Sequence, residues 1–451
     1  MRLQLAFLSL AALWTCPPAL AHDLHVEPRH DHSKGSLITL VGSAGDDLPG
    51  GPVAEAGATD QKRDRAILQY KIRLAARADD TDAMARLGLT YLDQARSVED
   101  PRFYSQAESL FTHALALEAN DFAALLGMAS LSLSRHDFKG ALSWAGRGLA
   151  SYPESAPFLG VLVDGNVELG RYDEATMALD RMLAVKPDLT AYARASYLFE
   201  LRGEHDRAIE AMEMAATAGR SGTEEAAWCR THVGDLHWKN GQLDLAEQHY
   251  RAADAALPGY PRALAGLARL AAARGELETA EMLYEAVLES FPSAQYRIEL
   301  GDVLVALGHP DEAAEQYHLV RDAAAEAREH GMNVDLEMSL FELDHGADPA
   351  AITIVAEDAY DRRPSVQAAL VLGWSLYKAA EVEAALPRMR EALRLGTRDP
   401  DWLYRAGVVF AQAGQTAEAR RCLEAALRLN PQFSPVAAPD ARRILSGLEE
   451  S

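Results

Sequence analysis

Cysteine and long apolar runs are both scarce in this sequence. Only three cysteines occur among 451 residues, too few for the disulfide framework that supports small secreted folds. Beyond the first residues, no stretch approaches the roughly 20 apolar residues that a membrane-spanning helix needs. Four motifs of catalytic and cofactor sites are also missing: the serine nucleophile elbow, His-Glu-x-x-His, the phosphate-binding loop and Cys-x-x-Cys. We therefore expect no catalytic activity and no bound cofactor.

In their place, one small residue returns at a nearly fixed interval. Successive positions differ by 33 to 38 residues, apart from a double interval of 72 between Ala313 and Ala385. The recurring alanines are Ala107, Ala141, Ala175, Ala208, Ala246, Ala280, Ala313, Ala385 and Ala419. A stack of two-helix units needs a small residue wherever neighbouring helices approach closely. The period therefore predicts a helical solenoid, with a degenerate unit around Ala351 in the double interval.

The residues around these alanines follow a common frame. One unit reads Ala406-Gly407, Phe410, Ala419, Leu423, Ala426 and Pro431, and another reads Val233-Gly234, His237, Ala246, Tyr250, Ala253 and Pro258. Gly or Ala allows close helix packing, larger residues fill the space beside it, and proline ends the second helix. This pattern resembles the tetratricopeptide repeat. The resemblance implies an all-α fold, a right-handed α-solenoid of about ten helix pairs with a capping helix at each end.

The frame also divides the chain. We place the solenoid at residues 81–431, with its degenerate unit near 333–365, and capping helices at 61–80 and 432–451. Cys229 and Cys422 lie more than five units apart in such an elongated stack, so we expect both to be free thiols.

The N-terminus carries an export signal. Arg2 precedes an apolar run and Ala19-Leu20-Ala21, a small-residue cleavage site, so residues 1–21 are predicted to be a secretory signal peptide. Cleavage after Ala21 predicts a periplasmic protein of a Gram-negative bacterium. The alternative is lipidation of Cys16, which would anchor the protein to a membrane.

Residues 22–60 are predicted to form a flexible arm that contains His, Gly and Pro. His22, His25, His30 and His32, with nearby carboxylates, are candidate copper or zinc ligands, and the other interpretation is a solvated arm without a specific role. Acidic residues outnumber basic ones by 67 to 44, giving a net charge of −23. Such a surface repels nucleic acid, so a protein or peptide is the expected partner.

The resemblance places groove-facing side chains on the first helix of each unit. The mapped positions are Asp164, Tyr197, Glu200, Trp228, Asp235, Trp238, Arg262, Arg269, Asp302, Trp374, Tyr377 and Tyr404. Exposed Trp and Tyr on a concave face can anchor a peptide, although a one-residue error in the frame would turn Trp238 or Trp374 inward. The Lys/Asn/Arg set by which some family members hold a C-terminal carboxylate is missing from these positions.

These observations predict a non-catalytic periplasmic or envelope scaffold that mediates protein–protein interaction through its concave groove. One alternative is a scaffold subunit of an envelope secretion or polysaccharide-export machine. The other is a periplasmic metal-handling protein that uses the histidine arm.

Overall fold

The computed structural model describes residues 56–97 and 100–449. The predicted signal peptide and residues 22–55 of the predicted arm lie outside them. Within the described residues the chain forms twenty-two helices and no strand. The helices are α1 (Ala56–Ala76), α2 (Thr81–Ser97), α3 (Arg102–Leu117), α4 (Phe122–Ser134), α5 (Phe138–Ser151), α6 (Ala156–Glu168), α7 (Tyr172–Val185), α8 (Leu189–Leu201), α9 (His205–Ala218), α10 (Glu224–Lys239), α11 (Leu243–Ala256), α12 (Pro261–Ala273), α13 (Leu277–Ser290), α14 (Ala294–Leu307), α15 (Pro310–Glu329), α16 (Asp335–Asp344), α17 (Pro349–Arg362), α18 (Val366–Lys378), α19 (Val382–Ala392), α20 (Pro400–Gln412), α21 (Thr416–Leu429) and α22 (Ala437–Glu449).

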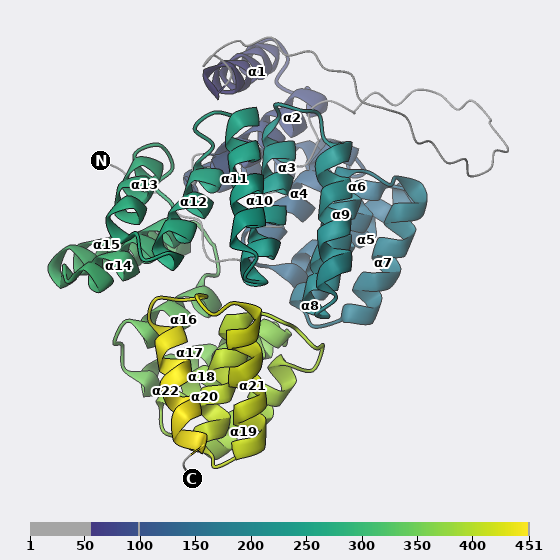
Figure 1. Cartoon of the computed structure of the whole chain (residues 1–451). Helices are drawn as coiled ribbons and strands as arrows, with labels where there is room; N and C mark the ends of the chain where they lie inside the picture. Colours follow the sequence, from purple (N-terminus) through teal and green to yellow (C-terminus); the bar gives the residue numbers. More distant parts are fainter. Residues whose placement is uncertain (1–55, 98–99, 450–451) are drawn as a thin grey trace, which may run out of the picture.

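Consecutive helices pair into ten hairpins, from α2 with α3 to α20 with α21, and α1 and α22 flank them (Figure 1). This confirms the predicted all-α solenoid. The nine recurring alanines lie on the second helices and expose at most 1% of their surface. Hairpin α16–α17 differs, because Ala351 is exposed and Thr353 and Ala356 are buried instead.

Glycine in the first helices makes room for an aromatic ring from the second helix. A Cβ atom at Gly88 on α2 or Gly127 on α4 would lie only 2.5 or 2.3 Å from the ring of Phe111 on α3. Phe111 is fully buried between them. Tyr250 on α11 occupies the same kind of slot between α10 and α12. These rings fill the space between consecutive hairpins, which explains why the unit repeats as one packing solution.

The turn inside each hairpin requires a residue with positive φ. Seven of the nine described turns hold glycine there, with φ between 69 and 91°. These residues are Gly170, Gly203, Gly241, Gly275, Gly308, Gly346 and Gly414. The other two turns hold His136 (φ 59°) and Ala380 (φ 64°), whose side chains make this conformation costly.

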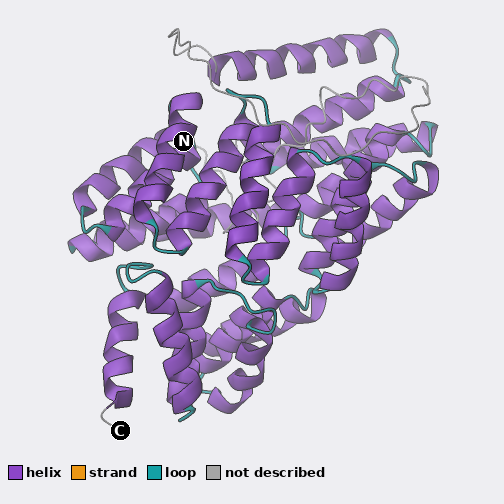
Figure 2. Ribbon diagram, turned by 45° about the vertical axis from the view of Figure 1, so that its right-hand side comes forward, coloured by secondary structure: helices purple, strands orange, loops and turns teal. Residues whose placement is uncertain are grey.

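The solenoid doubles back on itself. Hairpins from α16 onward, with α22, form a block beneath α1–α15 (Figure 1), and the turned view in Figure 2 shows the same block below the longer stack. We call α1–α15 the N-terminal half and α16–α22 the C-terminal half. No helix of the described residues is long and apolar enough to cross a membrane.

Candidate partner-binding face

The residues predicted to face a partner all lie on the first helices of the hairpins. They come from α6, α8, α10, α12, α14, α18 and α20. The twelve positions are Asp164, Tyr197, Glu200, Trp228, Asp235, Trp238, Arg262, Arg269, Asp302, Trp374, Tyr377 and Tyr404. Their surroundings differ, and burial together with charge pairing separates them into three groups.

Three aromatic members are core residues. Trp228 exposes 2% of its surface, Trp374 5% and Tyr197 9%. Trp228 stacks on His232, and Trp374 donates its indole N–H to Asp344 on α16 at 2.9 Å. The expectation that Trp228 and Trp374 lie exposed in a groove is therefore wrong. Their rings pack inside the stack, where burial removes a large apolar area from water.

Most charged members pair with the first helix of a neighbouring unit. Asp164 on α6 binds Arg194 on α8, with 2.6 Å between oxygen and nitrogen. Asp235 on α10 binds Arg269 on α12 at 3.0 Å, and Arg269 also reaches Glu299 on α14 at 3.2 Å. The side chains of successive units therefore bridge one another across this face.

The same arrangement recurs on both sides of these pairs. Glu200 on α8 binds Lys239 at the end of α10 at 2.6 Å, and Asp302 on α14 lies 3.2 Å from His345, which follows α16. We call these bridging residues the charge ladder. Its members are Asp164, Arg194, Glu200, Lys239, Asp235, Arg269, Glu299, Asp302 and His345.

For Glu200, Lys239 and Arg269, the paired charges outweigh burial and favour the charged form. The pKa of Asp164 is instead raised, because burial outweighs its pairing with Arg194. Burial raises the pKa of Glu200, but the ammonium of Lys239 outweighs this effect and leaves the pKa below its ordinary value. Burial lowers the pKa of Lys239, yet Glu200 and Asp399 raise it above the usual range. Burial also lowers the pKa of Arg269, and the adjacent carboxylates again outweigh it. The ladder is a set of mutually neutralised charges that holds consecutive first helices in fixed positions.

In most ladder pairs, one residue is among the positions predicted from the sequence and its partner is not. The sequence feature that could have identified the missing partner is an acidic residue followed by a basic residue about one repeat later. The separation is 30 residues for Asp164 and Arg194, and 39 for Glu200 and Lys239. Because the repeat sets which helices are neighbours, such a spacing indicates a contact between units.

Four predicted positions outside the ladder keep part of their side chains accessible. Trp238, Arg262, Tyr377 and Tyr404 are all partly exposed. The guanidinium of Arg269 lies 5.3 Å from the ring centroid of Trp238. These four side chains provide cationic and aromatic surface on the first helices.

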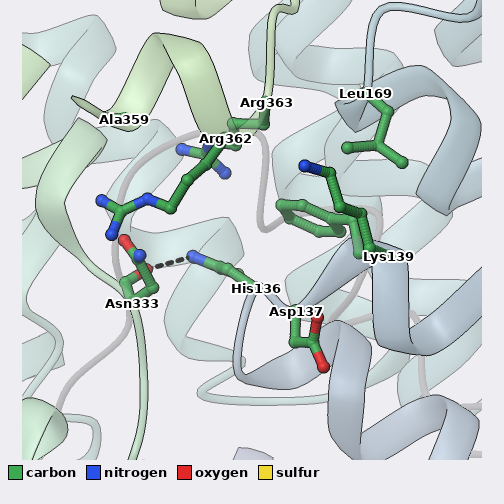
Figure 3. A pocket seen from close by; sticks show the side chains of 9 residues that line it. His136, Asp137, Lys139, Leu169, Asn333, Ala359, Arg362 and Arg363 are labelled. Carbon is green, nitrogen blue, oxygen red and sulfur yellow. Dashed lines mark hydrogen bonds between the residues drawn. The ribbon is translucent and has the colours of Figure 1, made fainter. Parts of the chain in front are cut away.

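A cavity of about 120 Å³ lies where the two halves meet (Figure 3). His136 Nδ1 donates to the carbonyl oxygen of Asn333 at 2.6 Å. Arg363 binds Glu337 at 2.5 Å. Arg362 forms ion pairs with Asp335 and Asp358. Both guanidinium groups are therefore already paired, and because residues of both halves line the cavity, it is part of the contact between them. Its lining residues are His136, Asp137, Phe138, Lys139, Leu169, Asn333, Ala359, Arg362 and Arg363.

The predicted metal ligands His22, His25, His30 and His32 lie outside the described residues. Among the described residues, Glu281, His309 and Glu312 offer ligand atoms within 4.8 Å of one another. Imidazole with carboxylates suits zinc and similar ions. The group is mostly exposed, as surface acids commonly are.

Comparison with known proteins supports the repeat assignment. Family models described as tetratricopeptide repeat match residues 162–223, 237–298 and 370–434. A curated relative, cellulose synthase 1 operon protein C of Komagataeibacter xylinus, is 24% identical over 291 residues. The match covers 64% of this chain and 20% of the relative, so the chain spans about a fifth of that protein.

Three solved structures to which the chain shows some similarity are the following. A tetratricopeptide repeat protein from Parabacteroides merdae is 16% identical and has a TM-score of 0.40, with 52% of this chain and 89% of that chain covered. A thermophilic TPR protein of Thermus thermophilus is 22% identical, with a TM-score of 0.36 and coverage of 46% and 99%. The Cut9–Hcn1 complex is 13% identical, with a TM-score of 0.36 and coverage of 87% and 94%.

Proposed function

Because this chain is a tetratricopeptide repeat protein, we propose that it is a non-catalytic periplasmic scaffold that holds a protein or peptide partner along its first helices. The charge ladder carries this proposal. It fixes α6, α8, α10, α12, α14 and the end of α16 relative to one another, so the face is ordered before a partner arrives. A preordered surface binds with a smaller entropy cost.

The contact surface in this proposal is made of the partly exposed side chains on the first helices. Arg262 and Tyr377 belong to it and neither is a ladder member. Aromatic and arginine side chains dominate the binding energy of protein interfaces, commonly at about 2 kcal/mol or more each. The ladder itself supplies shape and position, because its charges are already paired.

The test is capture of partners from the organism's own envelope fraction, followed by titration of the partner that mass spectrometry identifies. Replacing Arg262 and Tyr377 by alanine should weaken binding by about a hundredfold or more, with an unchanged helix content in circular dichroism. Met177→Ala with Met282→Ala is the matched control, since these side chains are 60% and 59% exposed on the second helices α7 and α13. Lost binding in the control pair and retained binding in the first pair would refute the proposal.

Periplasmic location in this proposal depends on the signal peptide. The intact mass of the exported protein should correspond to a chain that begins at His22. A diacylglycerol adduct on an N-terminal Cys16 would instead make the protein a membrane-anchored scaffold.

A second candidate function is supported by the relative named for the cellulose synthase operon. In this alternative the protein is a scaffold subunit of an envelope machine that makes or exports a polysaccharide. Components of such a machine should then dominate the captured proteins, in amounts that fall with Arg262→Ala. The metal-handling alternative stays a prediction, and the metal content of purified protein with and without residues 22–32 tests it.

A further inference from the structure

The two halves of the solenoid meet through their turns. At the turn of α4–α5, the N–H of Asn333 donates to the carbonyl of Arg135 at 3.1 Å, and His136 donates back to the carbonyl of Asn333. At the turn of α6–α7, the hydroxyl of Tyr172 accepts a hydrogen bond from the N–H of Val366 at 2.9 Å. In both places, a turn inside an N-terminal hairpin receives the loop that precedes a first helix of the C-terminal half.

The next two turns continue this row. Gly203, in the turn of α8–α9, lies against Gly396, and the side-chain amide of Asn430 donates to the carbonyl of Trp238 beside the turn of α10–α11. Three of the hydrogen bonds join residues 197, 194 and 192 positions apart along the chain. This nearly constant separation means that the halves dock in register, one loop to each turn.

Glycine has a second role in the docked turns. A Cβ atom at Gly170, Gly203 or Gly241 would lie 2.2, 2.1 or 2.5 Å from a backbone carbonyl oxygen of the C-terminal half. Gly275 and Gly414 occupy the same turn position elsewhere, with φ of 83 and 70°, and nothing lies within 4 Å of a Cβ built there. Close backbone approach is therefore needed only where the halves touch.

Ion pairs also cross between the halves. Lys239 binds Asp399 at 3.0 Å, and Arg363 lies 3.4 Å from Glu168, with both of the latter side chains less than a tenth exposed. Apolar contact between the halves comes from two clusters. Met338 and Phe341 on α16 pack against α14 and α15, as consecutive hairpins of the stack do. Away from this connection, Val366, Leu395 and Trp402 pack against the apolar core of α6–α10.

These contacts differ from those inside each half. A hydrogen bond to a carbonyl contributes little net stability, because water can replace it when the halves separate. A buried ion pair also contributes little, because the cost of removing its two charges from water offsets much of their attraction. The helices of a half, by contrast, share nearly continuous apolar packing with their neighbours. Separation of the halves therefore requires less free energy than unfolding a hairpin.

We propose that this row of turn contacts is a releasable clasp that opens as one unit. Opening needs only small changes in the angle between consecutive hairpins, because apart from these turn contacts and the Val366 cluster each repeat packs mainly against its neighbours. Every hairpin stays folded, while the doubled solenoid becomes longer and its two halves separate. The clasp residues are Arg135, His136, Glu168, Gly170, Tyr172, Gly203, Trp238, Lys239, Gly241, Asn333, Arg363, Val366, Gly396, Asp399 and Asn430.

Gly203→Ala and Gly275→Ala form a matched pair for the first test. Both variants add one methyl group at a turn with positive φ, but only the methyl group at residue 203 would collide with the other half. Small-angle X-ray scattering of the full chain should show a larger radius of gyration for Gly203→Ala alone. Circular dichroism should show the same helix content in both variants. Equal scattering from the two would overturn the proposal.

Tyr172→Phe and Asp399→Asn test whether the clasp opens as a unit. Tyr172→Phe removes only the hydroxyl that accepts from Val366, and Asp399→Asn weakens the ion pair with Lys239 while retaining an oxygen that can cap α20. In both variants the amide of Asn333, which contacts the separate turn of α4–α5, should exchange hydrogen about tenfold faster or more than in the unaltered chain. Faster exchange at Val366 alone would show independent local contacts and refute a single clasp. Unchanged exchange throughout would mean that the halves do not separate.

Discussion

Replacing Arg269 by methionine tests whether the charge ladder holds consecutive repeats together. Methionine keeps most of the aliphatic stem and removes the charge. Arg269 is the cation between Asp235 at 3.0 Å and Glu299 at 3.2 Å, and the side chains of all three are 20 to 28% exposed. Without it, two largely buried carboxylates lose their counter-ion.

The expected cost is about 2 to 3 kcal/mol. Breaking a fully buried ion pair costs about 3 to 5 kcal/mol, and the residual exposure of this site reduces that figure. The tyrosine hydroxyls reduce it further, since Tyr250 still donates to Asp235 and Tyr284 to Glu299, each at 2.7 Å. The loss should be local to α10, α12 and α14, because a repeat array unfolds in neighbouring units.

Hydrogen exchange resolved by helix, combined with urea unfolding, measures this effect. Arg251→Met is the control, because Arg251 is 68% exposed, pairs with Glu247 on its own helix, and should cost about 0.5 kcal/mol or less. Equal exchange in the two variants would refute the structural role of the ladder. Unchanged stability with lost partner binding would instead show that Arg269 contacts the partner directly.

Three further predictions concern single side chains. Ala380→Gly should stabilise the protein by about 1 kcal/mol, measured by urea unfolding, because Ala380 holds φ at 64° in an exposed turn; no gain would mean that the strain is relieved locally. Ala246→Glu places a charge at a fully buried position and should cost several kcal/mol, seen as lost helix signal and a lower melting temperature. Burial lowers the pKa of His205 in the folded chain. Below pH about 6.5, the unfolded chain therefore binds a proton on this residue that the folded chain does not bind. Protonation then favours the unfolded chain, so the contribution of His205 to stability falls as the pH falls. The stability of His205→Gln relative to the unaltered chain should therefore rise as the pH falls from about 7 to 5 in paired melts, and a constant difference would contradict it.

The fold was predictable from the sequence because every unit solves the same packing problem. Ala246 and its equivalents must be small for the helices to touch, and this requirement recurs visibly. The orientation of side chains on the first helices was less predictable. Successive residues of a helix differ by about 100° in direction, so a shift of one position separates an exposed ring from a buried one. Trp228 and Trp374 lie on the buried side.

The docking of the two halves left no readable pattern in the sequence. Several of its contacts use backbone carbonyls, which any residue carries, and Gly170 and Gly203 look like any turn glycine because the turns need positive φ in any case. Cys229 and Cys422 are free thiols, as expected. The elongated stack from which that expectation was argued is wrong, since the C-terminal half folds back along the N-terminal half.

Docking in register also limits how the length of this chain can change. Deleting one complete hairpin between α12 and α15 would leave the remaining hairpins able to fold, since the core of each packs mainly against its neighbours. It would nevertheless bring a loop without Asn333 opposite His136 and leave Lys239 without Asp399. The number of repeats, which a simple solenoid can vary one unit at a time, is therefore fixed here by the requirement that two distant parts of the chain match.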